Sequence, residues 1–426
     1  MRLRDVYLMI LIGLFFRVCV SLWNAFWGPS IGANADATSF HQAAVNLFSY
    51  QGPIHELGEI SVKSGYILVE HPDFSHGWHL LDHFYSQSLA FIYFISTDSL
   101  FIGSLFSVFA WTTSASLLIQ IMQLLQVKIP DQFKAMAIYS LLPSSIILTG
   151  VTLREPFELL LVNVAMFTAL KVYLNKSIKF AVFLVLLIFF MKKFHIALYT
   201  FGLLMAISLI ILLTLRKLES YYFFQKFLIA IFIIFIIYFI IDWYGLSNII
   251  PFNYFNEKEL YKAASKKLSV LSLYETRTQF IYNIEINGIF DFFLFMPKHL
   301  LQYLFEPMPW RVEAPLDFMV LIENLFRAVL IFKILAGLFF NSLENRKILA
   351  FIFFSYLAIE AVWSSGTVNW GTAIRHHIPG MGLLIAAAFS CSKEKQNSPF
   401  YSILRKNISP RVNSPIPNDI DTGLSK

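Results

Sequence analysis

The sequence predicts an all-α fold: a polytopic transmembrane helical bundle of about ten spans with two long extracytoplasmic loops. Composition is the first reason, because 57% of the 426 residues are hydrophobic and only 14% are charged, whereas soluble domains carry about 25% charged residues. The second reason is that several apolar runs reach the roughly 20 residues that cross a bilayer as a helix. A β-barrel would instead show short segments of alternating polarity.

The apolar runs also place the individual spans along the chain. A shorter run at 84–96 cannot cross a bilayer, and we expect a helix at the membrane interface there. Asp98 is expected to cap the helix that follows it. The ten predicted spans are 6–26, 100–126, 133–150, 157–174, 178–191, 195–215, 222–241, 318–340, 348–363 and 378–391.

The sequence predicts four regions along the chain. These are 1–241, an N-terminal membrane module that includes the outer loop 27–83; 242–317, a second outer loop; 318–391, the C-terminal membrane helices; and 392–426, a polar, proline-rich cytoplasmic tail that is expected to be disordered.

The second outer loop carries two apolar segments. Residues 258–274 place apolar side chains at helical spacing opposite lysines, which predicts an amphipathic helix on the outer membrane surface. The stretch 289–310, interrupted by Lys298, His299 and Pro307, predicts an interfacial segment or, alternatively, a re-entrant hairpin.

The placement of lysine and arginine sets the orientation, because cytoplasmic loops carry an excess of both. With a cytoplasmic N-terminus, every short inner loop is basic, so we expect both termini inside and both long loops outside. The net charge of +6 reflects this bias and does not indicate nucleic-acid binding. The composition, rich in Phe, Ile and Lys, favours a bacterial plasma (inner) membrane. The inner basic residues are Arg2, Arg4, Lys128, Lys134, Lys171, Lys176, Lys179, Arg216, Lys217, Arg346, Lys347, Lys393 and Lys395.

Residues 33–35, Ala-Asn-Ala, have the small-x-small form of a signal-peptidase site. The preceding run contains Arg17, however, and Trp23 and Trp27 are bulky where a cleavage region is small. An uncleaved first transmembrane helix is therefore favoured over a cleaved signal peptide.

Charged and histidine side chains gather at the predicted outer ends of the spans, where a functional site is expected. A carboxylate there could deprotonate an incoming hydroxyl or hold a metal, and cations could hold a phosphate leaving group. The candidate catalytic residues are Asp36 and Glu155. The candidate substrate- and phosphate-binding residues are Arg154, Lys192, Lys193, His195, Arg375, His376 and His41.

Several of these residues also have purely structural interpretations. Asp36 could cap a helix at 37–49, and Arg154 could form a loop pair with Glu155. Lys192 and Lys193 could anchor the helix end at the interface. Arg17 could snorkel or pair with a carboxylate, whereas Glu323 and Arg327 are spaced as an i,i+4 pair. The role of Glu360 stays open.

His76, His79 and His83 are spaced so that a helix would place three imidazoles on one face. Asp82 lies nearby, but this is a weak pattern for zinc, because no closing ligand pattern is evident and Gly77 weakens a helix. Interfacial packing or sugar contacts are favoured over a metal site.

The arrangement resembles the GT-C superfamily of integral-membrane glycosyltransferases, which includes bacterial relatives of dolichyl-phosphate-mannose protein mannosyltransferases. The resemblance rests on Arg17 late in the first helix and on Asp36 with Phe40, Ala43 and Ala44 in the first outer loop. Further similar stretches are LPSSIILTGVTLREPFELLL (141–161), FEPMPW (305–310) and IRHHIPGMGLLIAAA (374–388).

This resemblance implies that Asp36 is the catalytic carboxylate and Glu155 the second acidic residue. Lys192, Lys193 and Arg375 would bind the phosphate of a lipid-linked donor. Family members often carry two adjacent carboxylates in the first loop, whereas this chain has Asp36 between two alanines. No cofactor is therefore firmly expected, and a divalent cation (Mg²⁺ or Mn²⁺) is left open.

The predicted function is transfer of a sugar from a polyprenyl-phosphate-linked donor to a lipid- or glycan-linked acceptor at the outer face of the membrane. An alternative is an O-antigen or capsule polymerase or ligase. A lipid-glycan transporter or flippase would instead need polar residues at mid-membrane depth and a pair of broken helices. A non-catalytic assembly subunit would tolerate substitution of the outer charges.

Overall fold

The computed structural model describes residues 1–28, 34–48, 84–217, 277–280, 289–340 and 343–391. The predicted all-α class is confirmed: the described residues form helices and no strand, and an isolated β-bridge joins Gln279 and Asn369. The helices are α1 (Leu3–Phe26), α2 (Asn34–Phe48), α5 (Phe84–Ile95), α6 (Leu100–Leu124), α7 (Ile129–Leu141), α8 (Pro143–Thr149), α9 (Glu155–Asn175), α10 (Ile178–Phe194), α11 (Ile196–Lys217), α14 (Ile289–Phe305), α15 (Pro315–Phe340), α16 (Leu343–Ser364), α17 (Trp370–His376) and α18 (Met381–Ser390).

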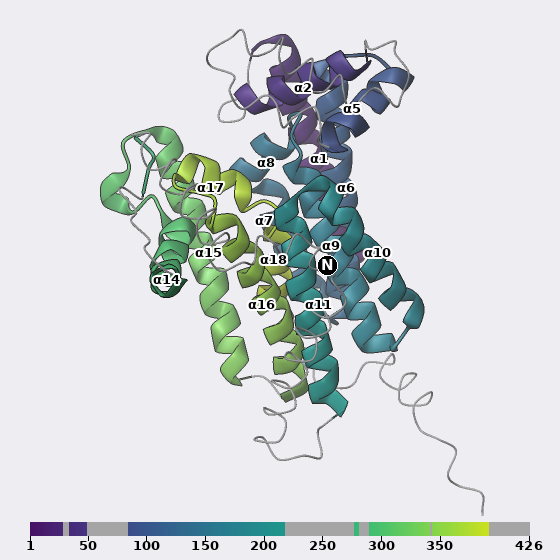
Figure 1. Ribbon diagram of the computed structural model, residues 1–426, viewed down its shortest axis with the longest axis vertical. Coiled ribbons are helices and arrows are strands. Elements are labelled where there is room, and N and C mark those ends of the chain that lie inside the picture. The colour runs from purple at the N-terminus through teal and green to yellow at the C-terminus, as the bar shows by residue number, and fades with distance from the viewer. Residues whose placement is uncertain (29–33, 49–83, 218–276, 281–288, 341–342, 392–426) are drawn as a thin grey trace, which may run out of the picture.

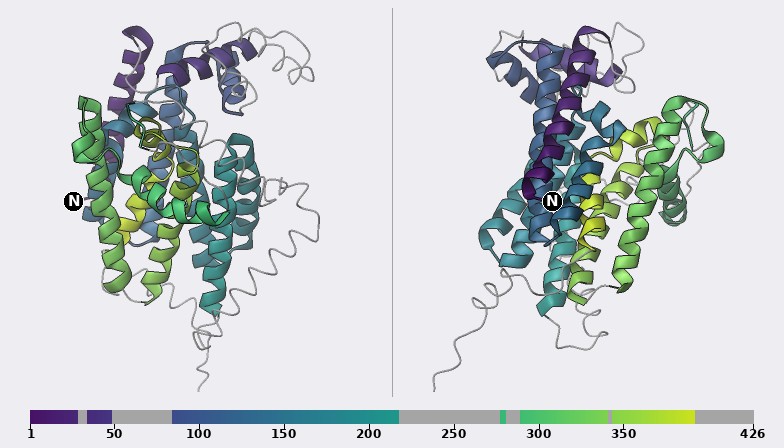
Figure 2. Two further views of the ribbon diagram at one scale, coloured as in Figure 1. Left: turned by 60° about the vertical axis from the view of Figure 1, so that its left-hand side comes forward. Right: turned by 180° about the vertical axis from the view of Figure 1, so that it is seen from behind.

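The long helices run side by side, and four shorter helices lie at one end of the bundle, whereas the short helix α18 lies inside it (Figure 1). That end carries α2, α5, α8 and α17, and we call it the α2 end. Figure 2 shows α2 and α5 at the same end in two further views. Helices joined by a short connection, such as α9 and α10 or α10 and α11, run in opposite directions, so loops distant in sequence meet at the α2 end.

Five described helices are long and apolar enough to cross a membrane: α1, α6, α9, residues 196–214 of α11 and residues 345–364 of α16. The described residues thus support several membrane crossings, whereas the count of about ten stays a prediction. The predicted span 222–241, the amphipathic helix 258–274, the tail 392–426 and the histidines at 76, 79 and 83 lie outside the described residues.

The predicted span 133–150 is wrong as one continuous helix. It is divided into α7 and α8, with Pro143 as the first residue of α8. Proline lacks the amide hydrogen that a helix interior needs, and its ring displaces the preceding carbonyl. The break turns backbone groups of both helices toward neighbouring side chains inside the bundle.

The C-terminal helix is also shorter than the predicted 378–391. Arg375 and His376 do not open it; they lie in the last turn of the separate helix α17. Helix α18 has ten residues, and all of them are buried. It approaches α9 closely, since a Cβ at Gly382 would lie 2.2 Å from the Asn163 side chain.

Three smaller predictions need correction. Ser99, not Asp98, caps α6, because the Ser99 hydroxyl accepts a hydrogen bond from the Ile102 amide. Asp36 is the third residue of α2 and not its N-cap. The stretch 289–310 is no hairpin, since α14 runs through Pro297 as one helix.

Candidate functional site

An arginine from α17 joins two carboxylates at the α2 end. Arg375 Nε and Nη2 donate to Glu155 Oε1, at 3.2 and 2.6 Å, and Nη1 donates to Asp36. The three side chains come from the start of α2, the start of α9 and the end of α17. The structure therefore assembles Asp36, Glu155 and Arg375, which we call the carboxylate–arginine triad.

The two carboxylates of the triad have opposite environments. The Glu155 side chain is 1% exposed, and its Oε2 has no hydrogen-bond partner among the described residues. The Asp36 side chain is 51% exposed. Burial alone would lower the pKa of Arg375, but the Glu155 and Asp36 carboxylates raise it above its ordinary value. Arg375 is therefore a fixed cation, and Asp36 is the carboxylate that a ligand can reach.

Arg154 does not pair with its neighbour Glu155, so the interpretation of these two as a loop pair is wrong. Its guanidinium lies 3.4 Å from the Glu158 carboxylate, one turn further along α9. It also lies 6.0 Å from the centre of the Phe40 ring of α2. Arg154 thus links α9 to α2 beside the triad.

Two predicted phosphate-binding histidines share one tryptophan. The rings of His195 and His376 each stack on Trp363, with ring centres 4.6 Å apart in both cases. His376 Nδ1 also lies 2.7 Å from the Thr367 hydroxyl. This histidine–tryptophan stack joins α16, α17 and the residue that follows α10.

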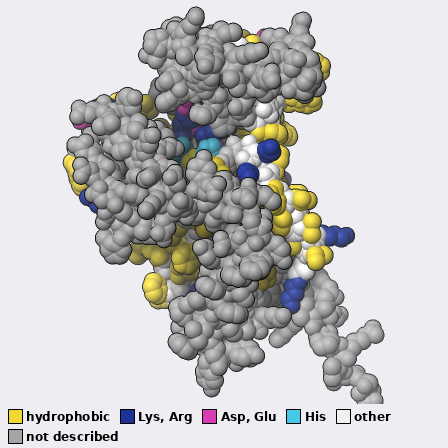
Figure 3. Space-filling view, in the orientation of Figure 1, with side chains coloured by type: hydrophobic (Ala, Val, Ile, Leu, Met, Phe, Trp, Pro, Cys, Tyr) yellow, Lys and Arg dark blue, Asp and Glu magenta, His cyan; other side chains and the backbone are white. Residues whose placement is uncertain are grey.

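Lys192 and Lys193 occupy the last turn of α10 and are exposed. The Lys192 amine lies 5.7 Å from the centre of the Tyr199 ring. Neither lysine contributes to the hydrogen bonds of the triad. The space-filling view shows basic, acidic and histidine side chains meeting in one recess near the α2 end (Figure 3).

His41 lies on the same helix as Asp36 but turns toward α5. Its Nδ1 is 2.7 Å from the Tyr93 hydroxyl, and the two rings meet edge to face. Burial lowers the pKa of His41, while Asp98 raises it. His41 therefore fixes α2 against α5 and is not a member of the triad.

Sequence reasoning missed a second charged group, formed around Asp317. Both Asp317 oxygens accept hydrogen bonds from Arg277, and Oδ1 also accepts one from Trp370 Nε1 at 3.1 Å. The segment before α17 pairs with residues 277–280 through backbone bonds. Asp317, in the first turn of a helix, carried the only sequence signal of this group.

Acid is expected to weaken this second group. Burial raises the pKa of Asp317, but hydrogen bonds from Arg277, Trp370 and two backbone amides outweigh it and bring the pKa to about 2. Because the folded pKa is depressed, the stabilisation is complete above about pH 4 and is lost as the pH falls through about 2. In thermal unfolding between these pH values, Asp317→Asn should show a weaker acid dependence than the wild type. Asp98→Asn, at an exposed site, should match the wild type; equal slopes for all three proteins would contradict the prediction.

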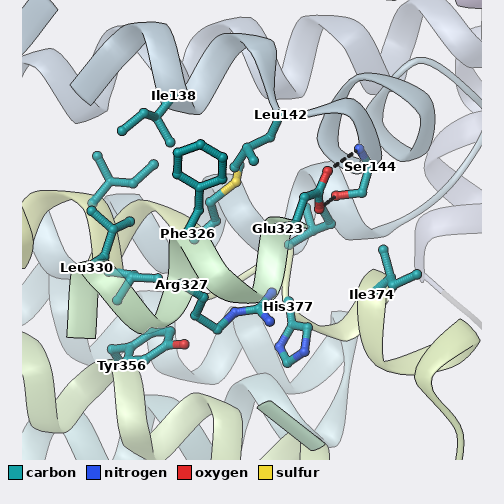
Figure 4. A pocket seen from close by; sticks show the side chains of 14 residues that line it. Ile138, Leu142, Ser144, Glu323, Phe326, Arg327, Leu330, Tyr356, Ile374 and His377 are labelled. Atoms are coloured by element: carbon teal, nitrogen blue, oxygen red, sulfur yellow. Dashed lines mark hydrogen bonds between the residues drawn. The ribbon is translucent and has the colours of Figure 1, made fainter. Parts of the chain in front are cut away.

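The predicted pair of Glu323 and Arg327 is replaced by separate partners at the helix break. Glu323 accepts hydrogen bonds from the Ser144 amide and hydroxyl, at 2.8 and 2.5 Å. Arg327 donates to the Leu304 carbonyl at 2.8 Å and to Asn324. Glu323 and Arg327 line a pocket of about 40 Å³ together with His377 (Figure 4). His377 Nδ1 is hydrogen-bonded to the Glu360 carboxylate at 2.6 Å.

Arg17 caps the other side of the same break. Its guanidinium donates to the Ser140 carbonyl of α7 and to hydroxyls of α8, and it lies 3.4 Å from the centre of the Trp111 ring. Arg17 is fully buried, so it does not snorkel, and no described carboxylate is its ion-pair partner.

Within the described residues, no group of three or more His, Cys, Asp or Glu side chains could hold a metal ion. Arg375 supplies the positive charge between Asp36 and Glu155. Comparisons with protein-family models, curated proteins and solved structures found no match to this chain.

Proposed function

We propose that this protein is a membrane glycosyltransferase that uses a polyprenyl-phosphate-linked sugar donor. The observation that carries the proposal is the triad: an accessible carboxylate, Asp36, held by an arginine whose other face is neutralised by the buried Glu155. A reactive carboxylate beside a fixed cation, at the end of an apolar bundle, suits a substrate whose scissile bond lies at the membrane surface.

In the proposed reaction, a hydroxyl oxygen of the acceptor attacks the anomeric carbon of the donor sugar. The bond between that carbon and the phosphate oxygen breaks, the electron pair leaves with the phosphate, and Asp36 takes the hydroxyl proton. Arg375 orients Asp36, and Glu155 orients Arg375. Arg154, Lys192, Lys193, His195 and His376 would bind the departing phosphate. No step uses a metal, and a requirement for Mg²⁺ or Mn²⁺ is left to experiment.

The orientation is part of the proposal. The lysines and arginines of the short loops favour cytoplasmic termini in a bacterial plasma membrane, with the α2 end outside. The donor, and a lipid- or glycan-linked acceptor, would then meet at the outer face. A polymerase or ligase of surface glycans would use the same side but would not need Asp36.

One observation favours a second candidate, a lipid-glycan transporter. The break between α7 and α8 is flanked by the buried charges of Arg17 and Glu323, and broken helices with buried charge are common in transporters. A transporter would still need no proton acceptor at Asp36.

The deciding test compares Asp36→Asn with Asp98→Asn, since Asp98 is exposed and at the same end. Each variant replaces the wild type in cells at matched membrane levels, and the surface glycans are profiled by mass. We expect Asp36→Asn alone to abolish addition of one sugar, with the mass lost giving its identity. Retention of the native profile by both variants would reject Asp36 as the base and favour the polymerase or the transporter.

A further inference from the structure

A cavity of about 260 Å³ lies next to the triad. It is an open cavity lined by residues 277–278, α8, the start of α15 and α17, and Arg375 is one of its lining residues. Its polar lining includes Arg277, Thr278, Asn369 and Thr372, whereas α8 and α15 contribute mainly aliphatic side chains. None of the predicted phosphate-binding residues except Arg375 lines it.

The charges around this cavity do not suit a phosphate. Arg277 is paired with Asp317, and Arg375 is paired with both Asp36 and Glu155. Three carboxylates therefore surround two guanidinium groups, and no net positive charge remains for an anion. Because these carboxylates neutralise both guanidinium groups, the cavity favours a neutral ligand over an anion.

The polar groups suit a ligand with several hydroxyls. A hydroxyl can donate to a carboxylate or amide oxygen and also accept from a guanidinium or threonine hydroxyl. The aliphatic wall suits the C–H face of a ring. The volume lies just below the roughly 300–1,000 Å³ of pockets for drug-sized ligands, which points to one sugar ring and not an extended chain.

We propose that this cavity binds the terminal monosaccharide of the acceptor, so that the acceptor is a glycan and not a protein side chain or a bare lipid. The inference rests on the proposed transferase function. Arg375 lines the cavity and also bonds Asp36, so a sugar held there lies beside the arginine that orients the proposed base. Its attacking hydroxyl would extend past Arg375 to reach Asp36. The donor phosphate would then bind on the side of the histidine–tryptophan stack.

Gly371 offers a way to fill the cavity without disturbing its frame. It lines the cavity, and a Cβ built there meets only Asn369 and Thr278 side-chain atoms, at 3.4 and 3.9 Å. Gly371→Leu should therefore place a branched side chain in the ligand space. Thr372→Val is a milder second variant that removes one lining hydroxyl. Thr113→Val is its matched control, because Thr113 is exposed on α6 and bonds only its own helix.

The experiment measures binding of free monosaccharides to the purified full-length protein by saturation-transfer NMR. The probes are glucose, galactose, mannose, rhamnose, N-acetylglucosamine and N-acetylgalactosamine, each with inorganic phosphate as competitor. We expect at least one sugar to bind with a Kd of about 1–10 mM. Gly371→Leu should weaken that binding at least tenfold and Thr372→Val several-fold (about threefold or more), whereas Thr113→Val and added phosphate should leave it unchanged.

Three results would overturn the proposal: no probe sugar binds, phosphate competes for the cavity, or Gly371→Leu and Thr372→Val both bind as the wild type does. Thermal unfolding of each variant shows whether Gly371→Leu is folded; if it is not, Thr372→Val decides. Asp36→Asn separates the two proposals, because it should bind the sugar normally even though transfer is lost. If transfer needs Asp36 but the cavity variants bind sugar normally, the proposed transferase function is kept and the proposed acceptor site is rejected.

Discussion

Replacing Arg375 with glutamine is expected to lower the free energy of unfolding by about 3–5 kcal/mol, because breaking a buried ion pair leaves an uncompensated charge. That charge is the Glu155 carboxylate, which is buried and accepts hydrogen bonds from both Nε and Nη2 of Arg375. Asp36 adds little to this cost, since water reaches its side chain. Thermal or denaturant unfolding of the purified protein in detergent measures the loss.

A double variant separates this cause from general damage to α17. In Arg375→Gln with Glu155→Gln, the buried charge is gone, so at least half of the lost stability should return. A double variant as unstable as Arg375→Gln alone would show that the buried charge of Glu155 is not the reason. Asp36→Asn serves as the exposed comparison and should stay within about 1 kcal/mol of the wild type.

The second large effect is expected at Arg17, where methionine should cost about 3–5 kcal/mol, because it leaves several buried acceptors without a donor at about 1–3 kcal/mol each. The guanidinium satisfies the carbonyls of Gly13 and Ser140 and the hydroxyls of Ser145 and Thr149. Methionine can replace none of these bonds. Arg4→Met, at an exposed site on the same helix, is the control, and its unfolding temperature should not change measurably.

A separate substitution tests the same packing without touching the arginine. A Cβ at Gly13 would lie 2.7 Å from the Trp111 ring and 2.8 Å from Ser140, so Gly13→Ala should push apart the partners of Arg17. If Arg17→Met and Gly13→Ala both unfold at the wild-type temperature, the break between α7 and α8 does not depend on this contact.

The sequence was sufficient to predict most of the long helices, because burial and lipid contact both select apolar side chains. The sequence was less informative at Pro143, where α7 ends and α8 begins. Apolar residues continue on both sides of this proline, so only its missing amide hydrogen indicates that the helix is interrupted. Helix α17 was missed for the opposite reason. Its seven residues, Trp370–His376, have no apolar period, and it is defined by the Asn369 cap and by pairing with residues 277–280.

For the candidate site, sequence predicted that Asp36, Glu155 and Arg375 share one end of the bundle. It could not predict that Arg375 joins the other two, because those bonds span 220 and 339 residues and depend on the arrangement of three helices. The same limit explains why Arg277, Asp317 and Trp370 were overlooked. Each looks ordinary in its own segment, and only the fold brings them together.

Helix α18 has a consequence for how the protein is made. Its ten residues are all buried, and it packs against α6, α7, α9, α15 and α16. The described helices therefore cover α18 almost completely, and all five of these helices precede it along the chain. We therefore expect these five helices, once inserted, to leave a gap that α18 fills after it is synthesised. A stop codon just before Met381 would remove α18 and expose the apolar side chains that pack against it. We expect the cell's quality-control proteases to degrade such a truncated protein.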